Sequence, residues 1–128
     1  DIIYQLDTEG RIKYVNPAWE ELLGHPPSHL TGKYLGDFLR QEDRVRFHAM
    51  YQNILTDKSS LRNKYFTIFN TRGLPRHIAL CGTPDVDAEG HVIGMVGTIK
   101  EVSQLRSIET QLRQASRTIG IKTGRLLP

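Results

Sequence analysis

Residues 61–103, LRNKYFTIFNTRGLPRHIALCGTPDVDAEGHVIGMVGTIKEVS, decide the fold. They contain three runs rich in Ile, Val, Phe and Tyr, which are residue types that favour β-strands. Two turn segments, TRGLP (71–75) and DVDAEGH (85–91), separate the runs, and each contains a glycine suited to a tight turn. Strands joined by such short turns pair antiparallel. This stretch therefore predicts three consecutive strands of an antiparallel sheet.

The preceding sixty residues predict a hairpin and then a helical region. Residues 1–16 hold two strand-like runs around Asp7, Glu9 and Gly10, which is a hairpin pattern. Residues 16–24 read as a short helix, with Asn16 as the expected N-cap and Gly24 as the expected C-terminal stop. Residues 41–55 have apolar residues at helical spacing. Two strands, a helical middle and three more strands indicate an α+β domain with a largely antiparallel sheet.

The pattern changes after residue 102. Apolar residues then step by three, four, three and four, which is a heptad seam: Leu105, Ile108, Leu112, Ala115 and Ile119. About two heptads are marginal alone, so they begin a longer coiled coil or pack on the sheet. We therefore expect a domain at 1–102, a linker helix at 103–119, and a tail or the start of another module at 120–128.

Composition excludes several classes of protein. The net charge of +3 comes from scattered Lys and Arg residues among acidic ones, so no nucleic-acid-binding stripe is expected. The single cysteine, Cys81, permits no internal disulfide and fits a reducing compartment. There is no apolar run long enough to span a membrane. The chain opens directly in strand-like sequence, so we expect it to be a piece of a longer protein. We expect this piece to lie in the cytoplasm, whereas the parent protein is either soluble or membrane-anchored.

Three stretches of the chain occur in an order typical of one protein family: DTEGRIKYVNPAWEELLG (7–24), LTGKYLGDFLRQEDR (30–44) and residues 70–103. Together they resemble PAS sensory domains, as found in bacterial-type signalling proteins. The first stretch is similar to the family's opening hairpin and Asn-x-Ala helix, and the other two resemble its middle segment and its paired strands. The family's closing Asp-Ile-Thr is here Glu101-Val102-Ser103, which keeps the charge and the hydroxyl, and Ser103 can cap the following helix.

The resemblance implies a five-stranded antiparallel sheet cupped by short helices, with a small-molecule pocket between them. It also implies a sensory input module for a histidine kinase or a diguanylate cyclase. Its signal would pass through Glu101 and Ser103 into the C-terminal helix of a homodimer, and from there to an output domain in the same chain. A domain of this fold that binds no ligand, and serves for dimerisation or protein docking, is an alternative.

Strand alternation and helical spacing predict which residues would line the pocket. The strand candidates are Phe66, Ile68, Ile78, Leu80, Met95 and Ile99, and the helical candidates are Trp19, Leu23, Phe38, Val45, His48 and Tyr51. Apolar walls with a few polar tips suit a small ligand but suit a solid core equally. Gly82 and Gly97 favour a cavity slightly, because they leave space on the sheet.

His48 raises the question of a haem cofactor. Haem-binding members of the family ligate iron through a histidine on the central helix, often followed by a tyrosine three residues later, and His48 and Tyr51 are similar to that arrangement. The alternative is an ordinary packed histidine at a variable position. Light-sensing members carry a reactive cysteine just before or within this helix, whereas Cys81 lies in a late strand, so flavin photochemistry is not expected.

No residue pattern indicates an enzyme. The glycines lie in turns between strands rather than in a phosphate-binding loop. Ser28, His29 and Cys81 do not match a known nucleophile motif. The five histidines are dispersed and have no cysteine partners, so no structural zinc site is expected, and His25 and His29 are interpreted as surface loop residues. Any catalytic activity would belong to another domain.

Overall fold

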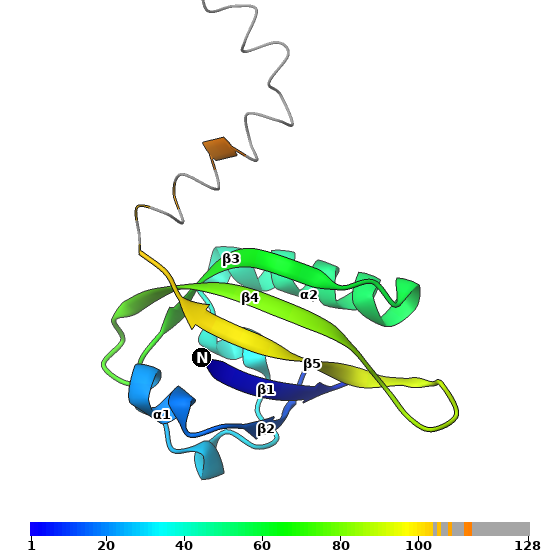
Figure 1. Cartoon of the computed structure of the whole chain (residues 1–128). Helices are drawn as coiled ribbons and strands as arrows, with labels where there is room; N and C mark the ends of the chain where they lie inside the picture. Colours follow the sequence, from blue (N-terminus) through cyan, green and yellow to red (C-terminus); the bar gives the residue numbers. More distant parts are fainter. Residues whose placement is uncertain (104, 106–107, 109–111, 114–128) are drawn as a thin grey trace, which may run out of the picture.

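The computed structural model describes residues 1–103, 105, 108, 112 and 113 (Figure 1). The elements in this part of the chain are β1 (Ile2–Asp7), β2 (Ile12–Val15), α1 (Ala18–Leu23), η1 (Pro27–His29), η2 (Leu35–Phe38), α2 (Gln41–Asp57), β3 (Leu61–Phe69), β4 (Pro75–Val86) and β5 (Val92–Glu101). The strands form one sheet in the order β2-β1-β5-β4-β3, and every neighbouring pair is antiparallel. The predicted α+β class and five-stranded antiparallel sheet are confirmed.

The last strand occupies the middle of the sheet. β5 pairs with β1 on one side, from Ile2↔Ile99 to Asp7↔Gly94, and with β4 on the other. The first and last strands of the domain are therefore neighbours, and β5 leaves the sheet beside the start of β1 (Figure 1). Any movement of β5 would have to break or shift hydrogen bonds on both of its edges.

The three hairpin turns of the sheet share one design. Each begins with an Asp or Asn whose Oδ1 accepts the backbone N–H groups two and four residues later, all at 2.9 Å. Each also has a glycine with positive φ three residues after that Asp or Asn. The three turns are Asp7–Arg11, Asn70–Leu74 and Asp87–His91. The short side-chain acceptor fixes the turn, and the glycine adopts the left-handed conformation without strain.

The short helix α1 differs from its predicted start. It begins at Ala18, and no side chain caps it. Asn16, the expected cap, instead accepts the N–H of Ile3 at 2.9 Å and so ties the end of β2 to β1. The predicted stop is confirmed, since Gly24 has φ 93° and donates its N–H to the carbonyl of Glu20 at 2.8 Å.

Candidate functional site: the core, a surface groove and the exit of the last strand

Most of the residues predicted to line a pocket meet in one hydrophobic core. Nine of them are at most 2% exposed, namely Trp19, Leu23, Tyr51, Phe66, Ile68, Ile78, Leu80, Met95 and Ile99. Phe38 is partly buried against the same cluster and makes an edge-to-face contact with Trp19 at 5.5 Å. The alternation argument therefore placed the strand residues on the correct face, and their side chains pack against one another.

The space expected beside Gly82 is filled. A Cβ on Gly82 would lie 2.6 Å from the Met95 sulfur and 2.7 Å from the Tyr4 hydroxyl oxygen. The Tyr4 hydroxyl donates to the carbonyl of Cys81 at 2.8 Å, and burial raises its pKa, with Cys81 and Tyr51 adding smaller contributions. At Gly97 a Cβ would lie 1.9 Å from the carbonyl oxygen of Cys81. These glycines permit close strand packing, and the prediction that they open a cavity was wrong.

Two predicted pocket residues on α2 do not face the core. Val45 is 76% exposed, and the side chain of His48 is also exposed. The buried face of α2 is formed by Asp43, Phe47, Tyr51 and Ile54. Each residue advances an α-helix by about 100°, so Val45 points roughly opposite to this face and His48 lies beside its edge. The prediction from helical spacing therefore assigned too many residues to the buried face of this helix.

His48 lies at a groove on the surface rather than in the interior. The groove has a volume of about 210 Å³ and is lined by Glu9, Gly10, Tyr34, Gly36, Asp37, Arg44, Phe47, His48 and Tyr51. Phe47 and Tyr51 stack with their ring centroids 5.9 Å apart. The Tyr51 hydroxyl donates to the backbone carbonyl of Asp7, and burial, with Asp7 and Asp85 adding to it, raises the Tyr51 pKa. The groove thus combines an apolar wall with charged groups of both signs.

These residues do not fit a haem. The groove is smaller than the roughly 300–1,000 Å³ of sites that enclose a drug-sized ligand. Behind it, the core is occupied by side chains such as Phe66 and Leu80. His48 shares the groove with the carboxylates of Glu9 and Asp37, which would be poor neighbours for a porphyrin face. The placement of His48 therefore argues against the haem alternative.

The exit of β5 is held by two contacts with β4. Arg76 and Glu101 form an ion pair at 3.2 Å, and the N–H of Val102 bonds the carbonyl of His77 at 2.8 Å. A hollow of about 390 Å³ adjoins this point, lined by Pro75, Arg76, His77, Glu101, Val102 and Ser103. The predicted junction residues Glu101 and Ser103 thus lie together where the chain leaves the sheet.

A polar chain links this exit to α2 and was not anticipated from the sequence. His77 Nδ1 lies 3.4 Å from the Thr67 hydroxyl, and the Thr67 N–H bonds the Asp43 carboxylate at 2.7 Å. Asp43 is 3% exposed and also pairs with Arg40 and Arg46. An acidic residue in the first turn of a helix is common, so the pattern did not distinguish Asp43 from its exposed neighbour Glu42.

His25 is not the free surface residue that the sequence suggested. Its ring packs edge-on against Phe38 at 5.1 Å, and its Nδ1 accepts the indole N–H of Trp19 at 3.1 Å. An indole N–H can only donate, so the imidazole must present an unprotonated Nδ1. Burial lowers the pKa of His25, and the positive charge of Lys33 lowers it further. Cys81 lies in β4, where it pairs with Thr98 of β5, and it is half-buried.

The predicted heptad helix lies only partly within the described residues. Leu105, Ile108 and Leu112 are helical and are 67%, 43% and 64% exposed. Ala115, Ile119 and the predicted tail at 120–128 lie outside the described residues. No helix among the described residues is long and apolar enough to cross a membrane.

Comparison with known proteins gives a consistent result. The family model described as "PAS fold" matches residues 1–107. White collar 2 protein of Neurospora crassa is 35% identical over 82 residues, which is 58% of this chain and 15% of that protein. The chain therefore spans a small part of that relative's length.

Two solved structures share the fold at low sequence identity. The light-state structure of the blue-light photoreceptor Aureochrome1 LOV has a TM-score of 0.76 at 15% identity, covering 89% of this chain and 91% of that one. The N-terminal domain of a diguanylate cyclase with PAS/PAC sensor from Marinobacter aquaeolei has a TM-score of 0.71 at 16% identity, covering 82% and 97%. These two likenesses show the fold alone. The family model, which matches residues 1–107, shows that the chain belongs to the PAS family.

Proposed function

We propose that this chain is the sensory input domain of a signalling protein of the histidine kinase or diguanylate cyclase type. A small ligand would bind at the groove beside Phe47 and Tyr51, and β5 would pass the change to the helix that follows Ser103. Domains of this family are generally regulatory sensory modules, and the described residues hold no recognised catalytic motif. Catalytic activity would then belong to an output domain in the same chain.

The central position of β5 is the observation that carries this proposal. Its inner side chains Met95 and Ile99 are fully buried against the helices, while both of its edges are hydrogen-bonded. Its end is pinned to β4 through Glu101 and Val102. A change in the packing of the core can therefore reach the exit without crossing a flexible loop.

The groove suits a ligand smaller than most cofactors. Its polar lining offers Arg44 and His48 as donors and two carboxylates as acceptors, while Phe47 and Tyr51 form the apolar wall. A ligand can shift the signalling equilibrium only if it binds one arrangement more tightly than the other. Tyr51 connects the groove to the β1–β2 turn through Asp7, so a bound molecule would be sensed by β1, the neighbour of β5.

The test is an insertion series in the full-length protein. One extra residue after Ser103 rotates the following helix by about 100°, and seven extra residues restore the phase of the heptad seam. We expect the single insertion to change output activity strongly and the seven-residue insertion to restore most of it. If the single insertion leaves activity and ligand response unchanged, rigid coupling through the helix is wrong.

A second candidate function is a ligand-free dimerisation or docking module. The filled core favours it, because nine predicted pocket residues pack among themselves with at most 2% exposure. The outer face of the sheet also exposes Ile3 (52%) and Tyr14 (51%), which a partner could cover. Mass spectrometry of small molecules released from the purified, denatured protein separates the two. A stoichiometric ligand supports the sensor, and its absence together with unchanged output across metabolite extracts supports docking.

We further propose that the domain works as a homodimer in the cytoplasm, joined through its C-terminal helices. The exposed Leu105, Ile108 and Leu112 support the dimer, since they follow the predicted heptad seam. The single half-buried free thiol of Cys81 is compatible with a reducing compartment.

A further inference from the structure

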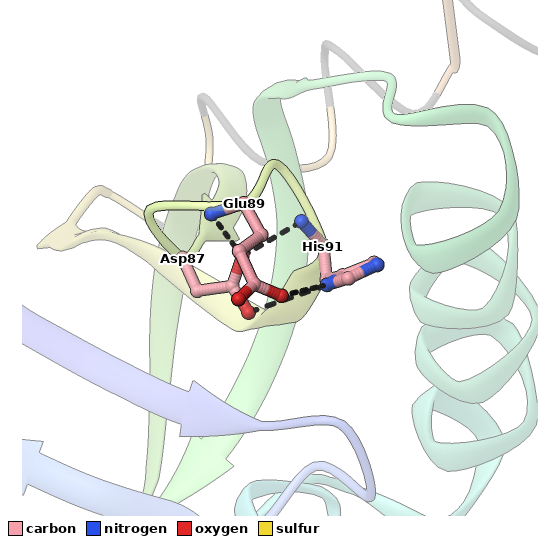
Figure 2. Close-up of side chains that lie close together, drawn as sticks. All are labelled: Asp87, Glu89 and His91. Atoms are coloured by element: carbon pink, nitrogen blue, oxygen red, sulfur yellow. Dashed lines mark hydrogen bonds and ion pairs between the residues drawn. The ribbon is translucent and has the colours of Figure 1, made fainter.

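Three side chains of the turn between β4 and β5, those of Asp87, Glu89 and His91, converge on one point (Figure 2). The Nδ1 of His91 lies 3.6 Å from Oδ2 of Asp87 and 3.5 Å from Oε2 of Glu89. One donor atom from each of the three residues falls within 4.8 Å of the others. Donors bound to a tetrahedral metal ion at about 2.0–2.1 Å stand about 3.3–3.4 Å apart. Small side-chain rotations would therefore bring all three onto one ion.

The hydrogen bonds that close the turn set this convergence. Asp87 uses its Oδ1 to hold the N–H groups of Glu89 and His91, which leaves Oδ2 on the same side as the other two donors. The turn between β1 and β2 has the same bonds from Asp7 to the N–H groups of Glu9 and Arg11. The chain thus contains a matched turn of almost the same sequence, Asp-x-Glu-Gly followed by a basic residue.

The two matched turns differ in the one residue that decides metal binding. In the β1–β2 turn, the guanidinium of Arg11 lies 3.3 Å from Glu9 and supplies a permanent positive charge. In the β4–β5 turn, the equivalent residue is His91, whose neutral imidazole is a metal ligand, whereas a guanidinium always stays protonated. The carboxylates of Asp87 and Glu89 therefore face an imidazole that can either pair with them as a cation or bind a metal ion together with them.

We propose that Asp87, Glu89 and His91 bind a divalent first-row transition metal ion such as Zn²⁺. One imidazole nitrogen and two carboxylate oxygens are donors that these ions accept, and water would complete the coordination. The side chains of Glu89 and His91 are 80% and 73% exposed, so an ion could enter without any rearrangement of the core. The competing arrangement, a protonated His91 paired with both carboxylates, is an exposed ion pair and contributes little to stability.

Metal binding at this turn would act on the hairpin that leads to the exit. Asp87 follows the end of β4 and His91 immediately precedes β5, so an ion bound to both residues would join the two strands at that end. Lys58, at the end of α2, donates to the carbonyl of Gly90 at 3.4 Å. Its positive charge lies beside the turn and would oppose the ion, so the site would bind Zn²⁺ less tightly than a buried structural site.

The test uses the complete chain and Zn²⁺ alone, with isothermal titration calorimetry and amide NMR shifts as readouts. We expect one saturable site that shifts the amides of residues 87–91 and weakens on acidification, because the ligand must be a neutral imidazole. His91→Arg gives this turn the Asp-x-Glu-Gly-Arg sequence that already folds between β1 and β2. We expect that variant to keep its melting temperature and to bind Zn²⁺ at least about tenfold more weakly.

Two further variants make the test specific. His29→Ala removes an exposed histidine from η1 and should leave Zn²⁺ affinity unchanged. Arg11→His gives the β1–β2 turn the same donor set and should raise the stoichiometry from one ion to two. Equal affinities of the wild-type protein and His91→Arg, or no saturable binding of Zn²⁺ up to millimolar concentration, would overturn the proposal.

Discussion

Single side chains in this domain have roles that their residue types do not reveal. His25 and His48 both lie near apolar residues in the sequence, yet their surroundings in the folded domain differ. His25 accepts the N–H of the fully buried Trp19, whereas His48 is exposed beside a groove. The buried indole N–H of Trp19 needs an acceptor, because leaving it without one costs about 1–3 kcal/mol. His25 supplies that acceptor.

His25 should make the stability of the domain depend on pH. Its pKa in the folded state is lowered by burial and Lys33 from the ordinary 6.5, so below that value the unfolded chain binds a proton more readily than the folded one. Stability from His25 is therefore complete above pH 6.5 and is lost as the pH falls towards the lowered pKa. Urea unfolding at pH 7.5 and pH 5.5, followed by Trp19 fluorescence, should show lower stability at pH 5.5.

The matched variant for this prediction is His25→Asn. The amide oxygen of Asn can accept the Trp19 N–H but does not titrate. This variant should lose part of the difference in unfolding free energy between the two pH values, whereas His29→Asn, on the exposed η1, should keep it. If His25→Asn and the wild-type protein show equal pH dependence, the Trp19–His25 hydrogen bond is not the cause.

At the scale of elements, the sheet depends on two paired glycines. Gly82 in β4 lies opposite Gly97 in β5, and Tyr4 in β1 also pairs with Gly97. The Tyr4 hydroxyl reaches the Cys81 carbonyl in β4, so its ring must extend across β5 at Gly97. A side chain on either glycine would compete for this space. The two glycines therefore allow β1, β5 and β4 to pack closely at this point.

The two glycines should respond differently to alanine. At Gly82 the new Cβ meets the end of Met95 and the Tyr4 hydroxyl, and the flexible Met95 can move, so we expect a loss of about 1–3 kcal/mol. At Gly97 it meets the backbone carbonyl of Cys81 at 1.9 Å, which can relieve the clash only if β4 and β5 separate. Gly97→Ala should therefore be clearly more destabilising than Gly82→Ala in chemical denaturation. An equal loss at both positions would show that the strand spacing adjusts easily.

At the scale of the whole molecule, two surfaces are candidates for the interface of the proposed homodimer. The predicted seam exposes Leu105, Ile108 and Leu112, while the outer face of the sheet exposes Ile3 and Tyr14. Both are apolar, and either could form a dimer. The seam is favoured by its heptad spacing, which matches the requirement of two helices packed side by side.

Substitutions on the two surfaces should separate these arrangements. Leu105→Gln, Ile108→Gln and Leu112→Gln together should convert the dimer to a monomer, because they remove the apolar knobs of the seam. Ile3→Gln with Tyr14→Gln should leave the dimer intact. Sedimentation velocity over a range of protein concentrations measures both. Dissociation by the sheet substitutions alone would assign the interface to the sheet instead.

The sequence by itself determined the class of the fold and the strand residues of the core. Turn residues spaced along strand-like runs specify antiparallel neighbours, and period-two alternation specifies which side of a strand is apolar, because both properties are local. For this reason the five strands, the stop at Gly24 and the burial of Ile78, Leu80 and Ile99 were predictable.

Only the tertiary structure decided whether the apolar face encloses a cavity and what each polar group contacts. Met95 and Tyr4 fill the space at Gly82, Val45 lies outside the core, and Asp43 meets Thr67 from another element. These outcomes depend on distances between segments far apart in the chain, which no local pattern contains. A core is defined by how its volumes fit together, and that fit exists only once the sheet and the helices have met.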